Sequence, residues 1–379
     1  MIKSYIPKII LIFAFWRIAL FVVAFLALFA FPVFGNRFPY WDMLLSTTGL
    51  PSWIWGFGSF DGVHYLRIVT MGYESSQYSQ AFFPLFPLFI KMVTLYSGNF
   101  LVGLIFTNLV FLMALIVFYK LVELDYNHKT ALLSIILLLV FPTSFYFGSL
   151  YSESLFLFFT VSTVYLLRKK NYLAAGVYGL LACSTRIIGL WLIPLFLTEI
   201  FFEYKGTKVD KGTSTKIIFG LFLIPLGVFL YMLYLGFNFN DPILFLSSQP
   251  AFGAQRSSFI VTTPQVFFRY IKILLTVPVN STLFFNGFLE FCFTLISLIF
   301  LIIAYGKTRL SYWVFSFGCW LTPTLTGTFS SMPRYILMMF LLLPLIAKIN
   351  SKYFILLVTL FIILGMLLTA LFTRGYWVA

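Results

Sequence analysis

Long apolar segments recur along the whole chain and are separated by shorter polar ones. We expect eleven helices, near residues 9–31, 101–120, 130–148, 152–167, 171–185, 187–203, 217–237, 283–304, 310–328, 334–347 and 353–372. A helix needs about 20 apolar residues to cross a bilayer, and most of these segments approach that length. The two shortest, 171–185 and 334–347, are expected to tilt little or to end inside the protein. The pattern predicts an all-α polytopic membrane protein, with residues 1–379 forming one domain.

Two long segments interrupt this pattern. Residues 32–100 are rich in Pro, Gly, Trp and Tyr, and residues 238–282 form a second large loop. The stretch AFFPLFPLFIKMV, at 81–93, is apolar, but its two prolines make a full span doubtful. We expect a helix or a re-entrant element there, lying at the membrane interface.

Composition supports the membrane class. Hydrophobic residues make up 61% of the 379 positions and charged residues 9%, whereas soluble domains carry roughly 25% charged residues. The net charge of +14 would suggest a nucleic-acid partner in a soluble protein. With the N-terminus in the cytoplasm, however, most Lys and Arg fall in inner loops, as in the run Arg168-Lys169-Lys170. Topology therefore explains the charge, and no nucleic-acid partner is needed.

The same topology places unusual polar residues on the outer side. Five separate segments carry them: FDGVHYLRI, YSES, STR, FLSSQPAFGAQR and SMPRY. Polar groups near a membrane are costly, so their retention suggests function. The segments predict a composite site that opens outward, with the candidate residues Asp61, His64, Tyr65, Glu153, Arg186, Gln249, Arg256 and Arg334.

Each candidate also has a plainer interpretation. Asp61 shares a helix face with His64 and Tyr65, where it is either a general base or an ordinary helix-start acid. Glu153 opens an apolar helix and is either an N-terminal cap or a partner for a ligand. His64 has no second histidine nearby and is more typical of a packed or hydrogen-bonding group than of a metal ligand.

The basic and amide candidates are equally open from the residues alone. Arg186 and Arg334 are either arginines that reach lipid headgroups or clamps for a phosphate, which guanidinium binds bidentately. Gln249 and Arg256 lie in a loop, where polar contacts are common.

Several classes of chemistry are set aside. The sequence lacks GxGxxG after a strand, GxxxxGK[ST], HExxH and GxSxG. Cys183, Cys292 and Cys319 lie in apolar runs, so neither a disulfide framework nor a structural zinc site is expected. No metal-ligand set is visible, and the use of a divalent metal stays open.

These motifs also carry a family resemblance. FDGVHYLRIVTMGY followed by AFFPLFPL resembles the signature of the GPI mannosyltransferase II (PIG-V) family, WDxxxYLxIAxxGY with AFFPLYPL. FPTSFYFGSLYSESLF, LLACSTRIIGL (the family's ALTRxxGL) and SMPRYILMMFLLLP follow in the same order, over roughly 56–345. The departures are Phe60 for Trp, Val69 for Ala and Phe86 for Tyr.

The resemblance implies a bundle of the GT-C superfamily of polytopic transferases. It implies polyprenyl or dolichyl phosphate mannose as donor and Asp61 as catalytic base in the first outer loop. Glu153, Arg186 and Arg334 would line the site, and the two arginines would stabilise the departing lipid phosphate. The length is closer to the shorter prokaryotic members, which implies a prokaryotic cell membrane, or the ER membrane in a eukaryote.

The acceptor stays open between a glycolipid, another membrane glycan and a protein hydroxyl, and the sequence does not tell whether a protein partner is required. A transporter or flippase of a lipid-linked sugar is the main competing interpretation. Such transporters commonly show internal repeats and sites at the membrane midplane, whereas this chain shows no convincing repeat. A catalytically silent relative that acts as a partner subunit is a third possibility.

Overall fold

The computed structural model describes residues 5–35, 38–75, 78–252 and 256–378, and within these ranges it is helical and has no strand. The helices are α1 (Ile6–Ala30), α2 (Trp41–Leu44), α3 (Ser52–Trp55), α4 (Asp61–Met71), α5 (Leu85–Val93), α6 (Phe100–Val122), α7 (His128–Val140), α8 (Glu153–Arg168), α9 (Tyr172–Thr185), α10 (Leu192–Glu203), α11 (Lys211–Phe239), α12 (Leu244–Ser247), α13 (Thr263–Thr276), α14 (Thr282–Ala304), α15 (Leu310–Thr324), α16 (Met332–Ile336), α17 (Leu343–Ile346) and α18 (Ser351–Thr373).

Among the described residues, five helices are long and apolar enough to cross a bilayer, namely α1, α6, α11, α14 and α18. Side-chain caps define where four of them begin: Asn99, Asp210, Ser281 and Asn350 each accept a hydrogen bond from a backbone N–H of the first turn. The predicted helices at these positions are therefore present, and α11 begins six residues earlier than the 217–237 segment because Asp210 caps it.

Other expected helices are shorter or broken. The predicted helix 130–148 ends at Val140, before the Phe141-Pro142 pair, and resumes only as a 3₁₀ turn, Ser144–Gly148. The predicted helix 334–347 consists of α16, a 3₁₀ turn and α17. Most of this segment is buried within the protein, which is where irregular backbone is tolerated at membrane depth. The expectation that it ends inside the protein fits this arrangement.

The long first loop folds into short helices, α2 to α5. α5 has nine residues, which at a rise of about 1.5 Å each is about 14 Å and too short to span a bilayer. The expectation of a helix without a full span at 81–93 is therefore met. The loop 238–282 likewise contains α12 and α13.

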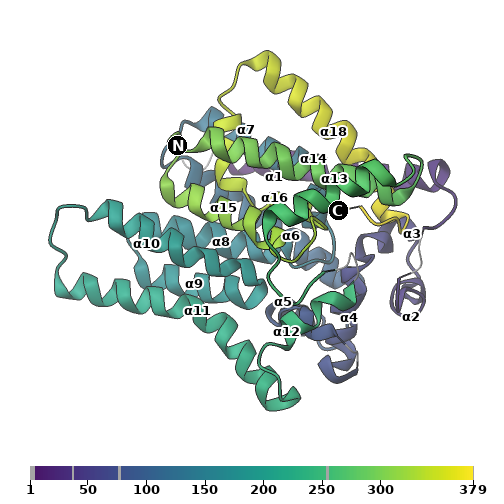
Figure 1. Ribbon diagram of the computed structural model, residues 1–379, viewed down its shortest axis with the longest axis horizontal. Helices are drawn as coiled ribbons and strands as arrows, with labels where there is room; N and C mark the ends of the chain where they lie inside the picture. Colours follow the sequence, from purple (N-terminus) through teal and green to yellow (C-terminus); the bar gives the residue numbers. More distant parts are fainter. Residues whose placement is uncertain (1–4, 36–37, 76–77, 253–255, 379) are drawn as a thin grey trace.

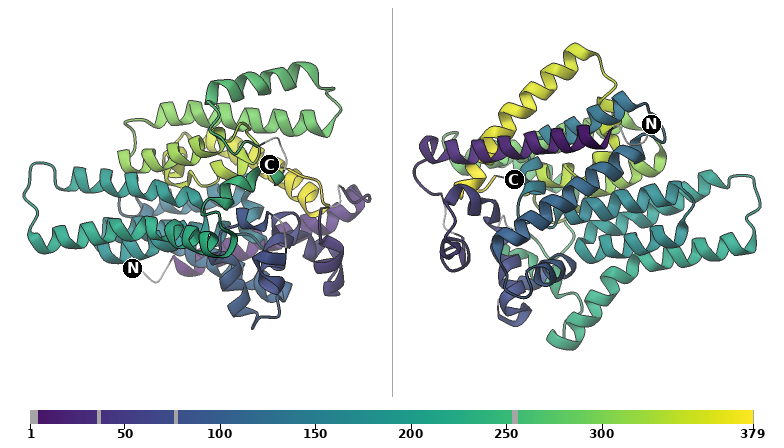
Figure 2. Two further views of the ribbon diagram at one scale, coloured as in Figure 1. Left: turned by 60° about the horizontal axis from the view of Figure 1, so that its bottom comes forward. Right: turned by 180° about the vertical axis from the view of Figure 1, so that it is seen from behind.

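Figures 1 and 2 show how the elements are arranged. α8, α9, α10 and the first half of α11 lie side by side, and α11, which contains Pro225, bends in its middle. Glycines bring α9 and α11 into backbone contact: a Cβ on Gly176 would lie 2.3 Å from the carbonyl oxygen of Gly220. Small residues permit this close approach in membrane helix pairs.

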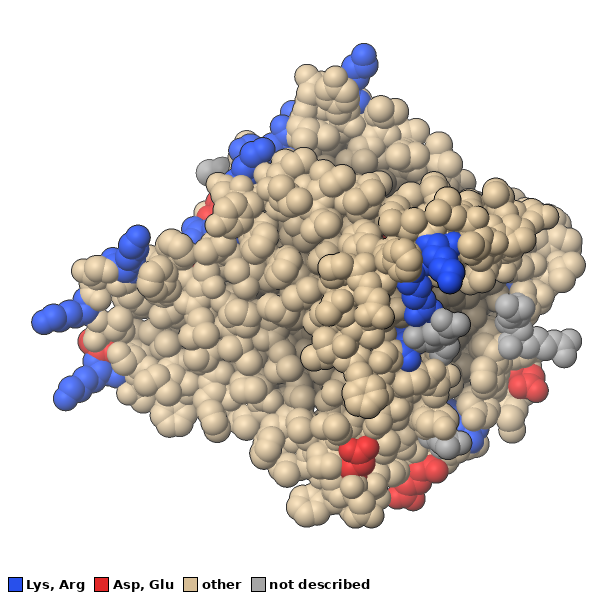
Figure 3. All heavy atoms as spheres, viewed as in Figure 1, with Lys and Arg blue, Asp and Glu red and all other residues tan. Residues whose placement is uncertain are grey.

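The space-filling view divides the surface by charge. In Figure 3, Lys and Arg side chains gather along the upper-left edge, and a broad band without charged side chains fills the middle. At the end of the bundle expected to be inner, Asp125 pairs with Arg168 at 2.6 Å and with Arg309 at 3.0 Å. Glu199 joins both arginines, at 3.2 and 3.1 Å. Four segments predicted to share one side of the membrane thus meet in one ion network.

Candidate active site

Asp61 is the first residue of α4, where the chain turns sharply. Phe60, just before it, has φ +58°, a left-handed conformation that is unusual for a non-glycine residue and that clusters at functional sites. The Tyr151 hydroxyl accepts a hydrogen bond from the Asp61 backbone N–H (3.1 Å) and donates to the Ser59 carbonyl (2.6 Å). Tyr151 lies in the FGSLYSES segment, so that segment fixes the backbone under the carboxylate.

Arg334 reaches Asp61 from the other end of the sequence. It lies in α16, a helix that begins directly after Ser331, and Ser331 also has a positive φ, +67°. Its Nη1 donates to Asp61 Oδ2 at 2.5 Å, and its Nε donates to Glu153 Oε1. The guanidinium lies beside the rings of Tyr146 and Tyr151, 5.0 and 4.8 Å from their centroids, within reach of a cation–π interaction with each. Arg334 thus bridges two carboxylates that come from different segments.

Glu153 binds a second arginine. It is the first residue of α8, is 0% exposed, and its Oε1 also accepts from Arg186 Nη1. Arg186 links α9 to the next 3₁₀ turn with extended backbone, and its Nη1 also donates to Ser152 Oγ at 3.4 Å. Because Asp61 and Glu153 each accept from guanidinium groups, both have a stronger interaction than helix capping. The cluster therefore contains two carboxylates and two guanidiniums, and its formal charge balances.

The electrostatics keep Asp61 ionised. Burial raises the pKa of this carboxyl, but the charge and hydrogen bond of Arg334 outweigh burial, and the net pKa is lowered. For His64, burial is the dominant effect. It lowers the pKa of the imidazole below the usual value, although the negative charge of Asp61 acts to raise it. At neutral pH the site therefore presents a carboxylate beside a neutral imidazole.

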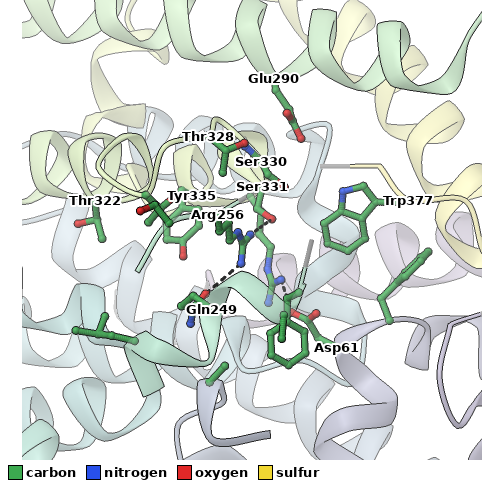
Figure 4. Close-up of a pocket in the computed structure, with 18 of the residues that line it drawn as sticks. Asp61, Gln249, Arg256, Glu290, Thr322, Thr328, Ser330, Ser331, Tyr335 and Trp377 are labelled. Carbon is green, nitrogen blue, oxygen red and sulfur yellow. Dashed lines mark hydrogen bonds and ion pairs between the residues drawn. The ribbon is translucent and has the colours of Figure 1, made fainter. Parts of the chain in front are cut away.

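The cluster borders a cavity of about 1470 Å³. This exceeds the roughly 300–1,000 Å³ typical of pockets for drug-sized ligands, so two substrates can be accommodated together. On the side facing Asp61, Arg256 donates to Gln249 Oε1 (3.2 Å) and to Ser331 Oγ (3.1 Å), as Figure 4 shows. Both partners are neutral, and among the described residues Arg256 forms no ion pair with a carboxylate.

The structure brings seven of the eight predicted site residues to this cavity: Asp61, His64, Tyr65, Arg186, Gln249, Arg256 and Arg334. Tyr65 donates from its hydroxyl to Ser152 Oγ at 2.9 Å, and His64 stacks on Phe82 with ring centroids 5.2 Å apart. Glu153 is the exception, because it lies behind the cavity wall and touches the site through the two arginines. Its expected role as a direct ligand for substrate therefore does not fit its burial.

Some residues at the site were not foreseen from the sequence. Tyr151 lies in the motif FPTSFYFGSLYSESLF, but its contact with Asp61 depends on tertiary packing. Glu290, in α14, also lines the cavity and is 5% exposed. Glu290 could have been identified as a candidate from the sequence, because a lone acidic residue within a long apolar segment is by default a functional candidate. Among the described residues, no three His, Cys, Asp or Glu side chains group as metal ligands would.

These features define an integral membrane protein whose helices enclose a cavity that is largely apolar, with an ionised carboxylate and arginines on its wall. The chain belongs to the PIG-V mannosyltransferase family, since a family model described as Mannosyltransferase (PIG-V) matches residues 48–368. The match confirms the resemblance found in the sequence motifs.

Solved structures give a more distant comparison. The chain is similar to the oligosaccharyltransferase of Archaeoglobus fulgidus, in its apo form (TM-score 0.49) and with a tethered acceptor peptide containing the NVT sequon (TM-score 0.48). In each case the identity is 13%, and the match covers 99% of this chain but 56% of the other. The chain thus spans little more than half the length of these neighbours. The comparison with curated proteins found no match.

Proposed function

We propose that this protein transfers mannose from polyprenyl or dolichyl phosphate mannose to a hydroxyl of a membrane glycolipid or other membrane glycan, with Asp61 as general base. The observation that carries the proposal is the position of Asp61, ionised and held by Arg334 on the wall of a cavity large enough for two substrates. The family match supports the mannosyl group, and the lipid-linked donor follows from family analogy.

The proposed step is an inverting displacement. Asp61 takes the proton of the acceptor hydroxyl as that oxygen bonds to the anomeric carbon of mannose. The bond from the anomeric carbon to the phosphate oxygen breaks on the opposite face, and its electron pair leaves with the lipid phosphate. A phosphodiester oxygen needs little protonation as it departs, so one carboxylate suffices where glycosidases use two.

Charge balance favours Arg256 for the donor phosphate. The sequence suggested Arg186 and Arg334 for this role, but carboxylates already neutralise both side chains. Arg256 is hydrogen-bonded to neutral groups, has no carboxylate in contact among the described residues and faces the same cavity, so its charge can stabilise a developing phosphate anion. Arg334 and Arg186 instead orient Asp61 and Glu153.

The proposed location is the extracytoplasmic face of the membrane, with the N-terminus in the cytoplasm. Two observations support it: the Lys-rich loops satisfy the positive-inside rule, and the loops assigned to the inner side meet in the Asp125–Arg168–Glu199–Arg309 network. Asp61 and its partners come from segments assigned to the outer side.

Mannose transfer by the purified protein in lipid, with synthetic polyprenyl phosphate mannose and a membrane glycolipid extract, tests the proposal. The Asp61→Asn variant should lose several orders of magnitude of activity, because the amide cannot accept the proton. The matched control is Asp42→Asn, an exposed acid of the same loop, which should keep wild-type activity. An active, well-folded Asp61→Asn variant would place the base elsewhere.

Two alternatives give distinct results in the same system. A protein O-mannosyltransferase would transfer the sugar to a peptide bearing Ser and Thr but not to the glycolipid extract. A flippase would show no transfer with either acceptor and would move the donor lipid across the vesicle membrane.

A further inference from the structure

A short segment that follows α18, residues 374–378, reaches the cavity, and the proposed transfer step uses none of its residues. Gly375, with φ +75°, ends α18 in a Schellman motif. Its N–H donates to the Phe372 carbonyl at 3.0 Å, and the N–H of Tyr376 donates to the Leu371 carbonyl at 2.9 Å. Glycine adopts this left-handed conformation without steric cost, so the helix stops here and the chain turns away from its axis.

Hydrogen bonds to the start of the first long loop fix the segment at its first residue. The Arg374 guanidinium donates to the carbonyls of Phe31 and Pro32, both at 2.8 Å. The Arg374 carbonyl in turn accepts from the N–H of Gly35 at 2.8 Å. These three bonds hold the backbone in place three residues before Trp377.

The other end of the segment reaches the ion cluster. The Val378 carbonyl accepts a hydrogen bond from the Tyr146 hydroxyl at 3.2 Å. The Tyr146 ring lies 5.0 Å from the guanidinium of Arg334, and Arg334 holds Asp61. Trp377, which directly precedes Val378, is therefore fixed from both sides and lies close to the carboxylate that we propose as the base.

Trp377 presents its indole to the cavity. The residue is half-buried and lines the cavity. Among the described residues, Phe60 is the one aromatic ring in contact with it, with centroids 5.1 Å apart and an angle of 81° between the planes. At this angle Phe60 covers at most one face of the indole. Phe60 directly precedes Asp61, and in Figure 4 the indole lies above Asp61 and to the right of Arg256.

Other aromatic residues near Asp61 are committed to packing. Tyr65 is 4% exposed, and the rings of Phe82 and Phe86 pack edge-on against it. Phe82 is 8% exposed and also stacks on His64. Trp377 is therefore the ring near the base that is best placed to offer a free face to a ligand.

The chemistry of the proposed step decides which ligand fits this face. The anomeric carbon must lie where the acceptor oxygen at Asp61 and the donor phosphate at Arg256 can both reach it. Trp377 lines the same cavity as these two residues. A pyranose ring has a face made largely of C–H groups, and a broad apolar ring packs well against it. Its hydroxyls, around the edge, stay available for the few polar groups that orient a ligand in such a pocket.

We propose that Trp377 binds the C–H face of the mannosyl ring of the donor and thereby holds the anomeric carbon between Asp61 and the departing phosphate. The inference rests on the proposed function, because that function supplies the sugar-bearing donor. It makes Trp377 a residue that selects the sugar-bearing lipid over the bare lipid phosphate.

Binding to the full-length protein in detergent tests the sugar contact without any transfer. The probes are citronellyl phosphate mannose, a short-chain analogue of the donor, and citronellyl phosphate, which lacks the sugar. We expect the wild type to bind the mannose-bearing probe more tightly. Trp377→Leu should weaken that binding about tenfold, the size expected for losing an aromatic contact, and leave the affinity for citronellyl phosphate unchanged. Trp377→Phe keeps an aromatic face and should recover most of the loss.

Trp53→Leu is the matched control, because Trp53 packs against Phe21 and Phe25 in the first loop and does not line the cavity. It should leave both affinities unchanged. Three results would each overturn the proposal: equal wild-type affinity for the two probes, equal weakening of both probes by Trp377→Leu, or equal effects of Trp377→Leu and Trp53→Leu.

The transfer assay separates this inference from the proposed function. We expect Trp377→Leu to raise KM for the donor and to leave KM for the acceptor unchanged. Mannose transfer by Trp377→Leu with the wild-type KM for the donor would refute the sugar contact and leave the proposed function standing. Binding of mannose that depends on Trp377, without transfer to any acceptor, would contradict the proposed function and leave the sugar contact standing.

Discussion

Replacing Arg334 with glutamine removes the charge that holds Asp61. In the structure, one guanidinium spans Asp61 and Glu153 with two different nitrogens, inside a buried cluster. Glu153 retains Arg186 in the variant, whereas Asp61 loses its ion-pair partner. Burial, which raises the pKa of Asp61, then acts without the opposing charge.

The expected loss can be scaled from the buried pair. Removing one partner of a buried ion pair costs roughly 3–5 kcal/mol. Since the Asp61 side chain is 19% exposed to the cavity, we expect the lower end of that range. If that energy is used to position the base, kcat/KM falls by about 100-fold, which is also the usual effect of removing one preorganised donor.

The pH dependence gives a second, independent readout. The proposed base Asp61 can accept a proton only when it is ionised, and we expect its lowered pKa to preserve the activity of the wild-type protein through mildly acidic pH. In Arg334→Gln the pKa of Asp61 rises, so the acid limb of kcat/KM moves to higher pH. Mannose transfer in proteoliposomes, measured from about pH 4 to about pH 8, follows this limb.

Arg374→Gln provides the control for a general loss of stability. Arg374 is also a buried arginine, but it donates to the backbone carbonyls of Phe31 and Pro32, both at 2.8 Å. It should lower the thermal midpoint without moving the acid limb. An Arg334→Gln variant with the wild-type acid limb would show that Arg334 does not set the ionisation of Asp61, and the reasoning would fail.

Three further outcomes follow from the same geometry. Glu153→Gln should lower kcat without moving the acid limb upward, because Arg334 then acts on Asp61 alone; an upward shift in the pH profile would contradict this. Arg256→Gln should lower kcat/KM for the donor by about 10- to 100-fold, as expected for a charged hydrogen bond of about 1.5–3 kcal/mol, with partial recovery in Arg256→Lys. Gly227→Ala should lower the thermal midpoint, because its Cβ would lie 2.2 Å from the Leu180 carbonyl oxygen, while Gly365→Ala, with ordinary contacts of 3.5 Å, should not.

The long membrane helices could be predicted because their signal is local. About 20 consecutive apolar residues with a capping residue before them mark a helix regardless of its neighbours, as at α6, α11, α14 and α18. The broken segment 334–347 is equally apolar, and nothing in its composition reports that its backbone is irregular. Burial by the surrounding helices stabilises it, and burial is a tertiary property.

The sequence could predict which residues form the site, but it could not predict which of them contact one another. The outer-side assignment put Asp61, Glu153, Arg186 and Arg334 on one face, which is why they could be grouped at all. Which arginine pairs with which acid depends on how α4, α8 and α16 meet. The sequence therefore suggested phosphate clamps where the structure has ion pairs, and it did not foresee that Tyr151 supports the Asp61 backbone.

The Asp125–Arg168–Glu199–Arg309 ion network, at the end proposed to face the cytoplasm, allows a test of the transporter interpretation. A transporter must open toward the cytoplasm, and that would separate Asp125 from Arg309, which are 3.0 Å apart at that end. A transferase that takes both substrates from the outer side needs no such opening. Cysteines at both positions, joined by a short reducible cross-linker in a Cys292→Ser background, lock this end covalently; Cys183 and Cys319 are buried and do not interfere.

We expect mannose transfer to persist in the locked protein, because the proposed chemistry occurs at the cavity bounded by Asp61 and Arg256. The uncross-linked double variant supplies the reference rate, so any effect of losing the network itself is measured separately. Loss of turnover on cross-linking that is reversed by reduction would mean that the inner end moves in each cycle. The cavity would then be one binding site along a substrate path across the membrane. The arrangement of Asp61 and Arg334 seen here would describe only one of the two conformations of a transport cycle.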